Sequence, residues 1–356
     1  MKVAIVGAGL SGLSCAFELK KHGIKPTIFE KESHIGNNLD YSITILRMFT
    51  DFNESPTKYF KKNYGLDIAS LNVLKKSIMI GPSRRILVRG NLGYIFKRGQ
   101  EPYSIENQIA RQVNLPVIFD TYIHFDDIKN DFDYIVWASG SNKLSRRLNT
   151  WTSAFNTNIR IATMLGDFKI NSATMWLNTE YAKNGYAYLL PYSKKNATLT
   201  LIVNNISPYE LDYYWKKFLS KENIQSKILE TRDVEYSTGF VNPIKLNNIY
   251  LVGNSAGLTE SCLGFGAVNA IRSGITAGRC IAKNLDYTKL MKDTGNFIKS
   301  TYELRKFLNS FENRDFDRLI NFLRLPLVKQ MVYNNPFYKS IHSARIIKHY
   351  NNFINN

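Results

Sequence analysis

The sequence predicts an α/β fold: a parallel sheet, an inserted antiparallel-sheet domain, and a helical C-terminal segment. Three observations lead to this prediction. An apolar strand, a glycine-rich loop and a helix follow one another at the N-terminus, and the same order returns from Tyr250 to Ile271. Between them, residues 151–240 contain alternating strand patterns of a different kind. A chain of 356 residues is long enough to form more than one domain.

The first glycine loop follows a short apolar run at residues 3–6, which is typical of a buried parallel strand. Gly7, Gly9 and Gly12 then occur in GxGxxG spacing. Gly7 permits a tight turn, Gly9 lets the backbone approach a pyrophosphate, and Gly12 lets the next helix pack closely on the strand. We expect that helix, which starts near Ser11, to point its N-terminal amides and the positive end of its dipole at the pyrophosphate.

A second strand at residues 26–29 leads to Glu30, which lies 18 residues after Gly12. A carboxylate at this place accepts hydrogen bonds from the ribose hydroxyls of an adenosine. A glycine-rich turn without a ligand is the alternative. We disfavour it because strand, loop, helix, strand and acid occur in order and at the right distances.

The second glycine loop places Gly253, Gly257, Gly264 and Gly266 within fourteen positions, in a chain that holds 21 Gly in 356 residues. Small residues are needed where backbone amides must touch a bound group. We therefore expect this loop to hold the other end of the ligand that the first loop binds.

Composition and charge exclude several classes of protein. The chain has 44% hydrophobic and 21% charged residues, and no apolar stretch approaches the length that spans a bilayer. Its N-terminus lacks the apolar region and cleavage site of a signal peptide, so we expect a cytoplasmic protein. The three Cys form no CxxC pair and the five His form no HxH or HExxH pattern, so we expect no metal. The net charge of +18 is scattered without a run of five cations, and we expect no nucleic-acid partner.

With these motifs, the sequence resembles the FAD-dependent oxidoreductases of the geranylgeranyl reductase type, whose fold is that of p-hydroxybenzoate hydroxylase. The GxGxxG unit with Glu30, the strand DYIVWASGS and the segment YLVGNSAGLTESCLGFGAVNAIRSGITAG occur in that family's order. The resemblance implies FAD as cofactor and a Rossmann-like FAD-binding domain over residues 1–75, 91–150 and 241–285. Residues 76–90 and 151–240 would form the substrate domain, and residues 286–356 the C-terminal helical segment.

The resemblance also implies roles for single residues. Asn254 would meet the ribityl hydroxyls, and Gly266 and Ala267 would offer amides to the flavin ring. Arg98 matches an arginine that precedes a helix, and the backbone of Ile123 would meet the adenine. The predicted cofactor-binding residues are Gly7, Gly9, Ser11, Gly12, Glu30, Tyr41, Ser42, Arg98, Ile123, Asn254, Gly264, Gly266 and Ala267.

The sequence departs from the family pattern at three places. Asn254 stands where the family usually has Asp, and Ser139 replaces the Asp of a motif that serves flavin and NADPH in the hydroxylases. Proline is absent at Ser261, beside Cys262. Cys262 lies in the loop that should face the flavin and is a speculative catalytic residue, although a small buried filler is the alternative.

The segment GYAYLLP at residues 185–191 is similar to the YxWxFP element that lines the lipid channel of prenyl reductases. Tyr186 and Tyr188 would then contact substrate, while an ordinary aromatic strand is the alternative reading.

Three functions follow from these features. The first is reduction of carbon–carbon double bonds in a prenyl lipid by hydride transfer from reduced FAD. The second is a flavin monooxygenase of a small aromatic substrate, which the missing Asp at Ser139 disfavours, and the third is a non-redox flavoprotein. The partners would be a hydrophobic or lipid substrate and an electron donor, either NAD(P)H or a reduced carrier protein.

The C-terminal residues 318–356 combine apolar side chains with six Lys or Arg and no acid. Leu319, Phe322, Leu323 and Leu327 recur at helical spacing, and Pro326 must break or kink the run. An apolar stripe flanked by cations is typical of a helix at a membrane surface, so peripheral membrane contact is one prediction. The alternative is that the stripe packs onto the substrate domain as core.

Overall fold

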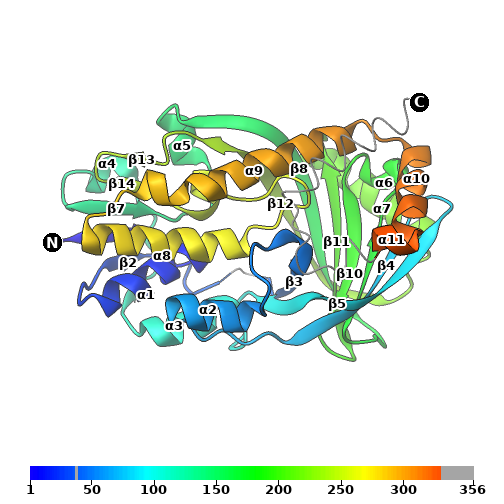
Figure 1. Cartoon of the computed structure of the whole chain (residues 1–356), viewed down its shortest axis with the longest axis horizontal. Coiled ribbons are helices and arrows are strands. Elements are labelled where there is room, and N and C mark those ends of the chain that lie inside the picture. Colours follow the sequence, from blue (N-terminus) through cyan, green and yellow to red (C-terminus); the bar gives the residue numbers. More distant parts are fainter. Residues whose placement is uncertain (37–38, 330–356) are drawn as a thin grey trace.

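The computed structural model describes residues 1–36 and 39–329, and two sheets dominate it (Figure 1). The first sheet has six strands in the order β13-β14-β7-β1-β2-β6, and all neighbours are parallel except β13 and β14. Its strands are β1 (Val3–Val6), β2 (Thr27–Phe29), β6 (Val117–Ile118), β7 (Tyr134–Trp137), β13 (Lys245–Leu246) and β14 (Ile249–Leu251). Strand β14 lies beside β7 although more than 100 residues separate them, as expected for a nucleotide-binding sheet with an insertion.

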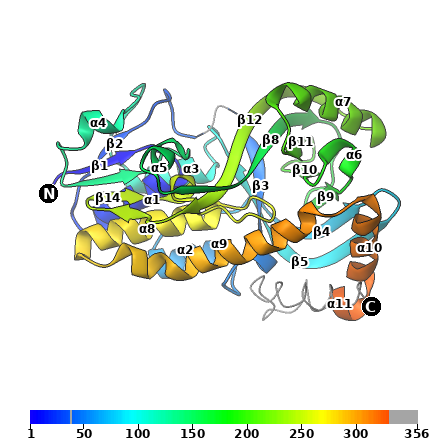
Figure 2. The same ribbon diagram turned by 90° about the horizontal axis from the view of Figure 1, so that it is seen from above.

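Helices α1 (Leu10–Lys21) and α8 (Ala267–Lys283) follow the two glycine loops and pack closely on one another. A Cβ at Gly274 would lie 2.1 Å from the backbone oxygen of Ser11, so only glycine allows this approach. Cys15 is fully buried in the core of this layer. Helix α9 (Tyr287–Asn309) runs beside α8 and reaches from the first sheet to the second (Figures 1 and 2).

The second sheet has eight strands in the order β12-β8-β11-β10-β9-β4-β5-β3. Neighbours are antiparallel except β4 and β9, which are parallel and thus depart from the predicted pattern. The strands are β3 (Tyr41–Leu46), β4 (Asn72–Ile80), β5 (Arg85–Arg98), β8 (Trp151–Leu165), β9 (Ser172–Trp176), β10 (Tyr186–Pro191), β11 (Asn196–Asn204) and β12 (Lys227–Val241).

This sheet takes in more of the chain than the sequence analysis assigned to the substrate domain. Residues 41–46 pair with residues 93–98 at its end, although both segments were predicted to lie in the FAD-binding domain. Long strands such as β5, β8 and β12 extend from the region of the second sheet toward that of the first. The strand pattern of the sequence alone therefore does not show where a domain ends. The domain boundaries themselves remain a prediction.

The two faces of the second sheet have different coverings. Helices α6 (Thr179–Ala182) and α7 (Leu211–Lys221) pack on one face around Trp215 and Phe218. On β11 the residues Leu199, Leu201 and Val203 face this core, so the alternate positions face the opposite side. The remaining short helices are η1 (Arg47–Phe49), α2 (Pro56–Tyr64), α3 (Ile105–Val113), α4 (Phe125–Ile128), α5 (Lys143–Arg147), η2 (Pro208–Glu210) and η3 (Gly253–Ala256).

The C-terminal segment is helical as far as it is described, through α10 (Asn313–Arg324) and α11 (Pro326–Lys329). Leu319, Phe322 and Leu323 pack against buried clusters of the second sheet, as expected if the stripe belongs to the core. Leu327 is 76% exposed. Residues 330–356, which carry much of the predicted membrane contact, lie outside the described residues.

Within the described ranges, no helix is both long and apolar enough to span a lipid bilayer.

Candidate cofactor and substrate site

A cavity of ≈ 750 Å³ lies where the two sheets meet, and both glycine loops line it. The face of the second sheet opposite α6 and α7 forms its other wall, through inward residues such as Ile161, Tyr188 and Ile202. This volume falls within the range of small-molecule sites in proteins. The cavity therefore joins the two predicted parts of the site, one polar and one largely apolar.

The first glycine loop presents its backbone to the cavity. Gly7 has a φ of +107°, and Gly12 packs so closely that a Cβ there would lie 1.9 Å from the Gly7 oxygen. A Cβ at Gly9, in contrast, would meet no atom within 4 Å, although Gly9 lines the cavity. Gly9 also begins α1 without a side-chain cap, so the first amides of the helix are left for another partner. Open space beside uncapped amides fits a pyrophosphate.

Glu30 lines the cavity and also braces the loop. Its Oε2 accepts a hydrogen bond from the Ala8 N–H at 2.7 Å, and its Oε1 accepts one from the Glu32 N–H at 3.1 Å. A carboxylate has about four acceptor positions, so Glu30 can accept from ribose hydroxyls as well. The sequence motif indicated the ribose contact but not the brace.

The second glycine loop mirrors the first. Gly253 donates its N–H to Ser273 Oγ at 3.0 Å, which fixes the end of β14 against α8. Gly264 has a φ of +81°, and a Cβ there would meet no atom within 4 Å. Gly266 begins α8 without a side-chain cap, and Gly266 and Ala267 both line the cavity. A second uncapped helix start thus faces the same space as the first.

Asn254 is held by two residues that the sequence analysis did not identify. The Tyr236 hydroxyl lies 2.7 Å from Asn254 Oδ1 and 2.6 Å from Thr259 Oγ1, and Thr259 Oγ1 donates to the same Oδ1. Burial raises the pKa of Tyr236 to about 12, so its hydroxyl stays protonated. Because Oδ1 is engaged, Asn254 would present its Nδ2 as a donor, a role that the usual Asp cannot take.

Arg98 and Tyr41 line the cavity together, with the Arg98 Cζ 5.8 Å from the centre of the Tyr41 ring. Arg98 Nε donates to the Oε1 of Glu106, which is 1% exposed. Glu106 was missed because it lies on α3 and only the folded chain brings it to Arg98. Its side chain orients the guanidinium toward the cavity wall.

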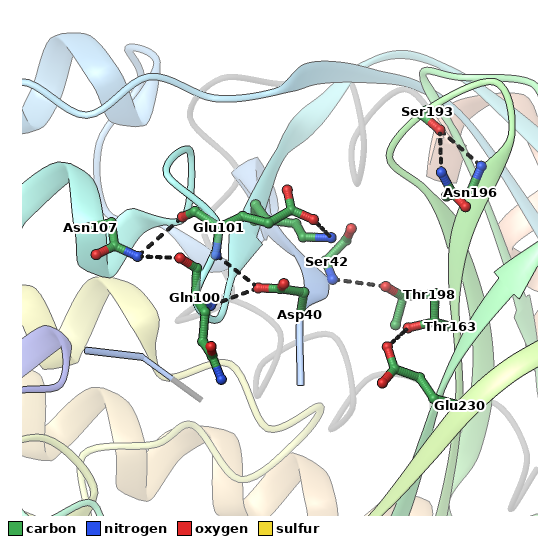
Figure 3. Close-up of polar contacts among 11 residues, drawn as sticks. Asp40, Ser42, Gln100, Glu101, Asn107, Thr163, Ser193, Asn196, Thr198 and Glu230 are labelled. Carbon is green, nitrogen blue, oxygen red and sulfur yellow. Dashed lines mark hydrogen bonds and ion pairs between the residues drawn. The ribbon is translucent and has the colours of Figure 1, made fainter. Parts of the chain in front are cut away.

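Two of the predicted cofactor-binding residues, Gly12 and Ser42, do not line the cavity. Strand alternation directs Tyr41 and Ile43 to the cavity, while the N–H of Ser42 donates to Thr198 Oγ1 at 2.8 Å (Figure 3). Ser42 is fully buried and does not line the cavity. Ile123 does line it, beside Thr121 and Tyr122.

Cys262 and the two predicted substrate tyrosines lie close together at the second glycine loop. Tyr186 and Tyr188 line the cavity, and the Tyr186 hydroxyl donates to the Leu263 oxygen. Cys262 is 5% exposed and also lines the cavity. Burial, and then the charge of Glu260, raise the pKa of the Cys262 thiol well above its usual range, so the thiol is neutral at physiological pH.

Two charged residues support this loop and were not predicted. The Glu260 carboxylate accepts the N–H groups of Cys262, Leu263 and Phe265 at 2.7–3.0 Å. Arg305, from α9, donates to the Cys262 oxygen at 3.3 Å. Glu260 is the only charged residue from Tyr250 to Ile271, and this was the available signal, because a charged residue needs partners when buried.

Ser139 lies on the cavity wall with its Oγ 3.2 Å from Ser255 Oγ. Ser139, the residue that departs from the family pattern, thus lies beside a second hydroxyl and not beside a charged group.

Asn204 Nδ2 and Thr238 Oγ1 are among the buried polar atoms of the sheet wall that have no hydrogen-bond partner in the described chain. Both residues line the cavity. Asn204 shares a register row with Tyr236 through Thr157, so these atoms lie on the side of the second glycine loop. Unpaired buried polar atoms at a cavity indicate a ligand with polar groups.

Comparison with known proteins supports the predicted fold. Residues 5–50 match the family described as NAD(P)-binding Rossmann-like domain. The digeranylgeranylglycerophospholipid reductase of Methanocella arvoryzae is 21% identical over 309 residues, which cover 79% of this chain and 77% of that protein. The enzyme of the same name from Methanococcus vannielii is 21% identical over 381 residues, with 94% and 87% covered.

Among solved structures, a geranylgeranyl bacteriochlorophyll reductase-like protein of Thermoplasma acidophilum has a TM-score of 0.73 at 17% identity, covering 96% of this chain and 95% of that one. The flavin-dependent brominase Bmp2 has a TM-score of 0.66 at 13% identity, covering 99% and 100%. The chain therefore has the fold of Rossmann-like flavoproteins. More particularly, it is related to the geranylgeranyl reductases, at low identity over most of its length, and the predicted fold class is confirmed.

Proposed function

We propose that the chain is an FAD-dependent reductase of carbon–carbon double bonds in an isoprenoid lipid. The observation that supports this best is that one continuous cavity contains both parts of the site. It joins two uncapped helix starts, which suit a dinucleotide, to a sheet wall that is largely apolar. The relatives at 21% identity are reductases of a lipid, which favours the same substrate class here.

The residues present fit FAD. The backbone amides at the start of α1, beside Gly9, would bind the pyrophosphate, and Glu30 would bind the ribose. Asn254 would contact the ribityl hydroxyls, and the amides of Gly266 and Ala267 would contact the flavin ring. The start of α8 would favour negative charge on the reduced ring, because amide dipoles there are oriented toward it.

When bound, reduced FAD supplies the hydride that adds to one alkene carbon. The neighbouring carbon then needs a proton. We propose Cys262 as its source, because its protonated thiol lines the cavity on the loop next to the ring. Water would return a proton to the sulfur afterwards. Glu260 and Arg305 would position this thiol through the backbone of the loop.

The sheet wall would hold the isoprenoid chain and exclude water. An isolated alkene is not activated, so its position in a dry channel must contribute much of the rate. Tyr186 and Tyr188 lie at the boundary between the loop and this wall. The aliphatic residues that line it include Leu74, Ile159, Ile161, Ala173, Met175, Leu190 and Ile202.

Two partners complete the proposal. Electrons would come from NAD(P)H or a reduced carrier protein, and a lipid substrate calls for peripheral contact with a lipid surface. Leu325 and Leu327, at 51% and 76% exposure beside Arg324, are the described residues that suit such contact.

The test uses protein reconstituted with FAD and reduced by dithionite without oxygen. Addition of a geranylgeranyl compound should oxidise the flavin and give a product heavier by two hydrogens for each double bond reduced. A product that gains oxygen, and only in air, would identify a monooxygenase. Bound flavin that no prenyl compound oxidises would point to the non-redox alternative.

A further inference from the structure

Arg232, on β12, faces the cavity without a charged partner. Its Nη1 is buried and has no hydrogen-bond partner within residues 1–36 and 39–329. Two other arginines with little solvent exposure are paired with carboxylates: Arg98 with Glu106, and Arg160 with Asp212 and Asp233. Burying a charged nitrogen away from water without a hydrogen-bond acceptor costs free energy. The chain alone therefore does not supply the partner that Arg232 needs.

A register row connects Arg232 to the apolar part of the cavity. Arg232 lies opposite Ile161, Ile161 opposite Thr200, Thr200 opposite Tyr188, and Tyr188 opposite Met175. All five side chains line the cavity. Four steps between strands, at about 4.8 Å each, make this row about 19 Å long. It begins at β12, which is an edge strand of the sheet, and ends beside the aliphatic cluster of Leu74 and Leu190.

The cofactor does not account for Arg232. Its phosphates would bind at the start of α1, on the other sheet. Along β12, Arg232 is four residues from Tyr236, the residue that contacts Asn254. That is about 13 Å at about 3.3 Å per residue, on the side away from the glycine loops.

Nearby carboxylates do not neutralise Arg232 either. Glu230, two residues along the same face, accepts a hydrogen bond from Thr163 Oγ1 at 3.0 Å (Figure 3). Glu235 lines the cavity but is exposed to solvent. Neither forms a salt bridge with Arg232 in the described part of the chain. An external anion is the remaining partner.

We propose that Arg232 binds a phosphate group carried by the isoprenoid substrate, whose chain lies along the row toward Met175. The fork of a guanidinium matches phosphate oxygens in pairs, which a lysine cannot do. The half-buried position at the edge strand would keep the charged group near water while the chain is buried. This inference rests on the proposed function and adds the chemistry of the head group and the direction of the chain.

Two kinds of substrate share this chemistry: a prenyl diphosphate and a prenylated glycerophosphate. The test measures binding of geranylgeranyl diphosphate, of digeranylgeranylglyceryl phosphate, and of geranylgeraniol, which has no phosphate. Calorimetry with the FAD-loaded protein gives the affinities of wild type, Arg232→Gln, Arg232→Lys and the control Arg89→Gln. Arg89 is exposed on β5 and does not line the cavity, so it removes the same charge elsewhere.

Arg232→Gln should weaken binding of the phosphate compounds at least tenfold and leave geranylgeraniol unchanged. Arg232→Lys should fall between, and Arg89→Gln should match wild type. The phosphate compound that binds wild type more tightly identifies the source. Equal affinities of wild type and Arg232→Gln for every compound would show that Arg232 does not bind the phosphate, while the proposed function stands. Failure of all three compounds to bind wild type would overturn both the proposed function and the role of Arg232. Equal FAD content and circular dichroism would show that the variants are folded.

Discussion

A single carboxylate, that of Glu30, serves both the glycine loop and the expected ribose. We predict that Glu30→Ala lowers FAD affinity by ten- to a hundredfold, because hydrogen bonds to a charged group contribute about 1.5–3 kcal/mol each and 1.4 kcal/mol is tenfold. Titration of the apoprotein with FAD, followed by flavin fluorescence, measures this. Glu303→Ala, at an exposed residue of α9 outside the cavity, is the control. Unchanged affinity of Glu30→Ala would mean that its carboxylate does not reach the cofactor.

All three cysteines should be protonated and slow to react with thiol reagents in the folded protein. Burial raises the pKa of Cys15 and Cys262 far above the usual range and raises that of Cys280 to about 11. We predict that Ellman's reagent at mildly alkaline pH labels none of them rapidly in the native protein and all three in guanidinium chloride. The FAD-loaded protein should likewise show no thiolate-to-flavin absorbance band. Rapid native labelling that Cys262→Ala abolishes would contradict the neutral thiol.

At the scale of elements, the contact between α1 and α8 depends on the absence of one side chain. A Cβ at Gly274 would lie 2.1 Å from a backbone oxygen of α1, whereas a Cβ at Gly295 in α9 would meet nothing within 4 Å. We predict that Gly274→Ala lowers the free energy of unfolding by several kcal/mol. Gly295→Ala should raise it by about 0.5–1 kcal/mol through helix propensity. Urea denaturation compares the two, and equal effects would show that the helices do not pack this closely.

The elements differ in how far the sequence could predict them. Glycine loops could be predicted because a turn or a close approach demands a particular residue at a particular place, as at Gly7 and Gly12. The extent of the second sheet could not, because the strand at 41–46 finds its partner at 93–98 only through the whole fold. The partners of predicted residues were missed for the same reason. Tyr236 contacts Asn254 from the other sheet. Arg305 contacts the second glycine loop from α9, a helix that comes later in the chain.

At the scale of the whole molecule, buried tyrosines should set the alkaline limit of stability. Burial raises the pKa of Tyr188, Tyr192, Tyr236 and Tyr250 from 10.0 to about 12. The unfolded chain therefore loses these protons at lower pH than the folded one. Their contribution to stability is complete below pH 10 and is lost as the pH rises through about 12. We predict that Tm falls over this interval, while tyrosine absorbance shows phenolates appearing together with unfolding.

A control at high salt would separate this effect from repulsion between charges at the surface. Tyr236→Phe should reduce the fall in Tm, because it removes one of the buried hydroxyls. An unchanged Tm from pH 9 to about 12 would contradict the assignment.

The parallel sheet is completed by β14, which pairs with β7 only after strands β8 to β12 of the second sheet have been inserted between them. During synthesis on the ribosome, the first glycine loop therefore emerges about 250 residues before its counterpart at the start of α8. Until α8 has emerged, the nascent chain has only one of the two loops that line the cavity. If the proposed function is correct, flavin can be retained only after α8 has been made, and a chain that ends before α8 should not retain it.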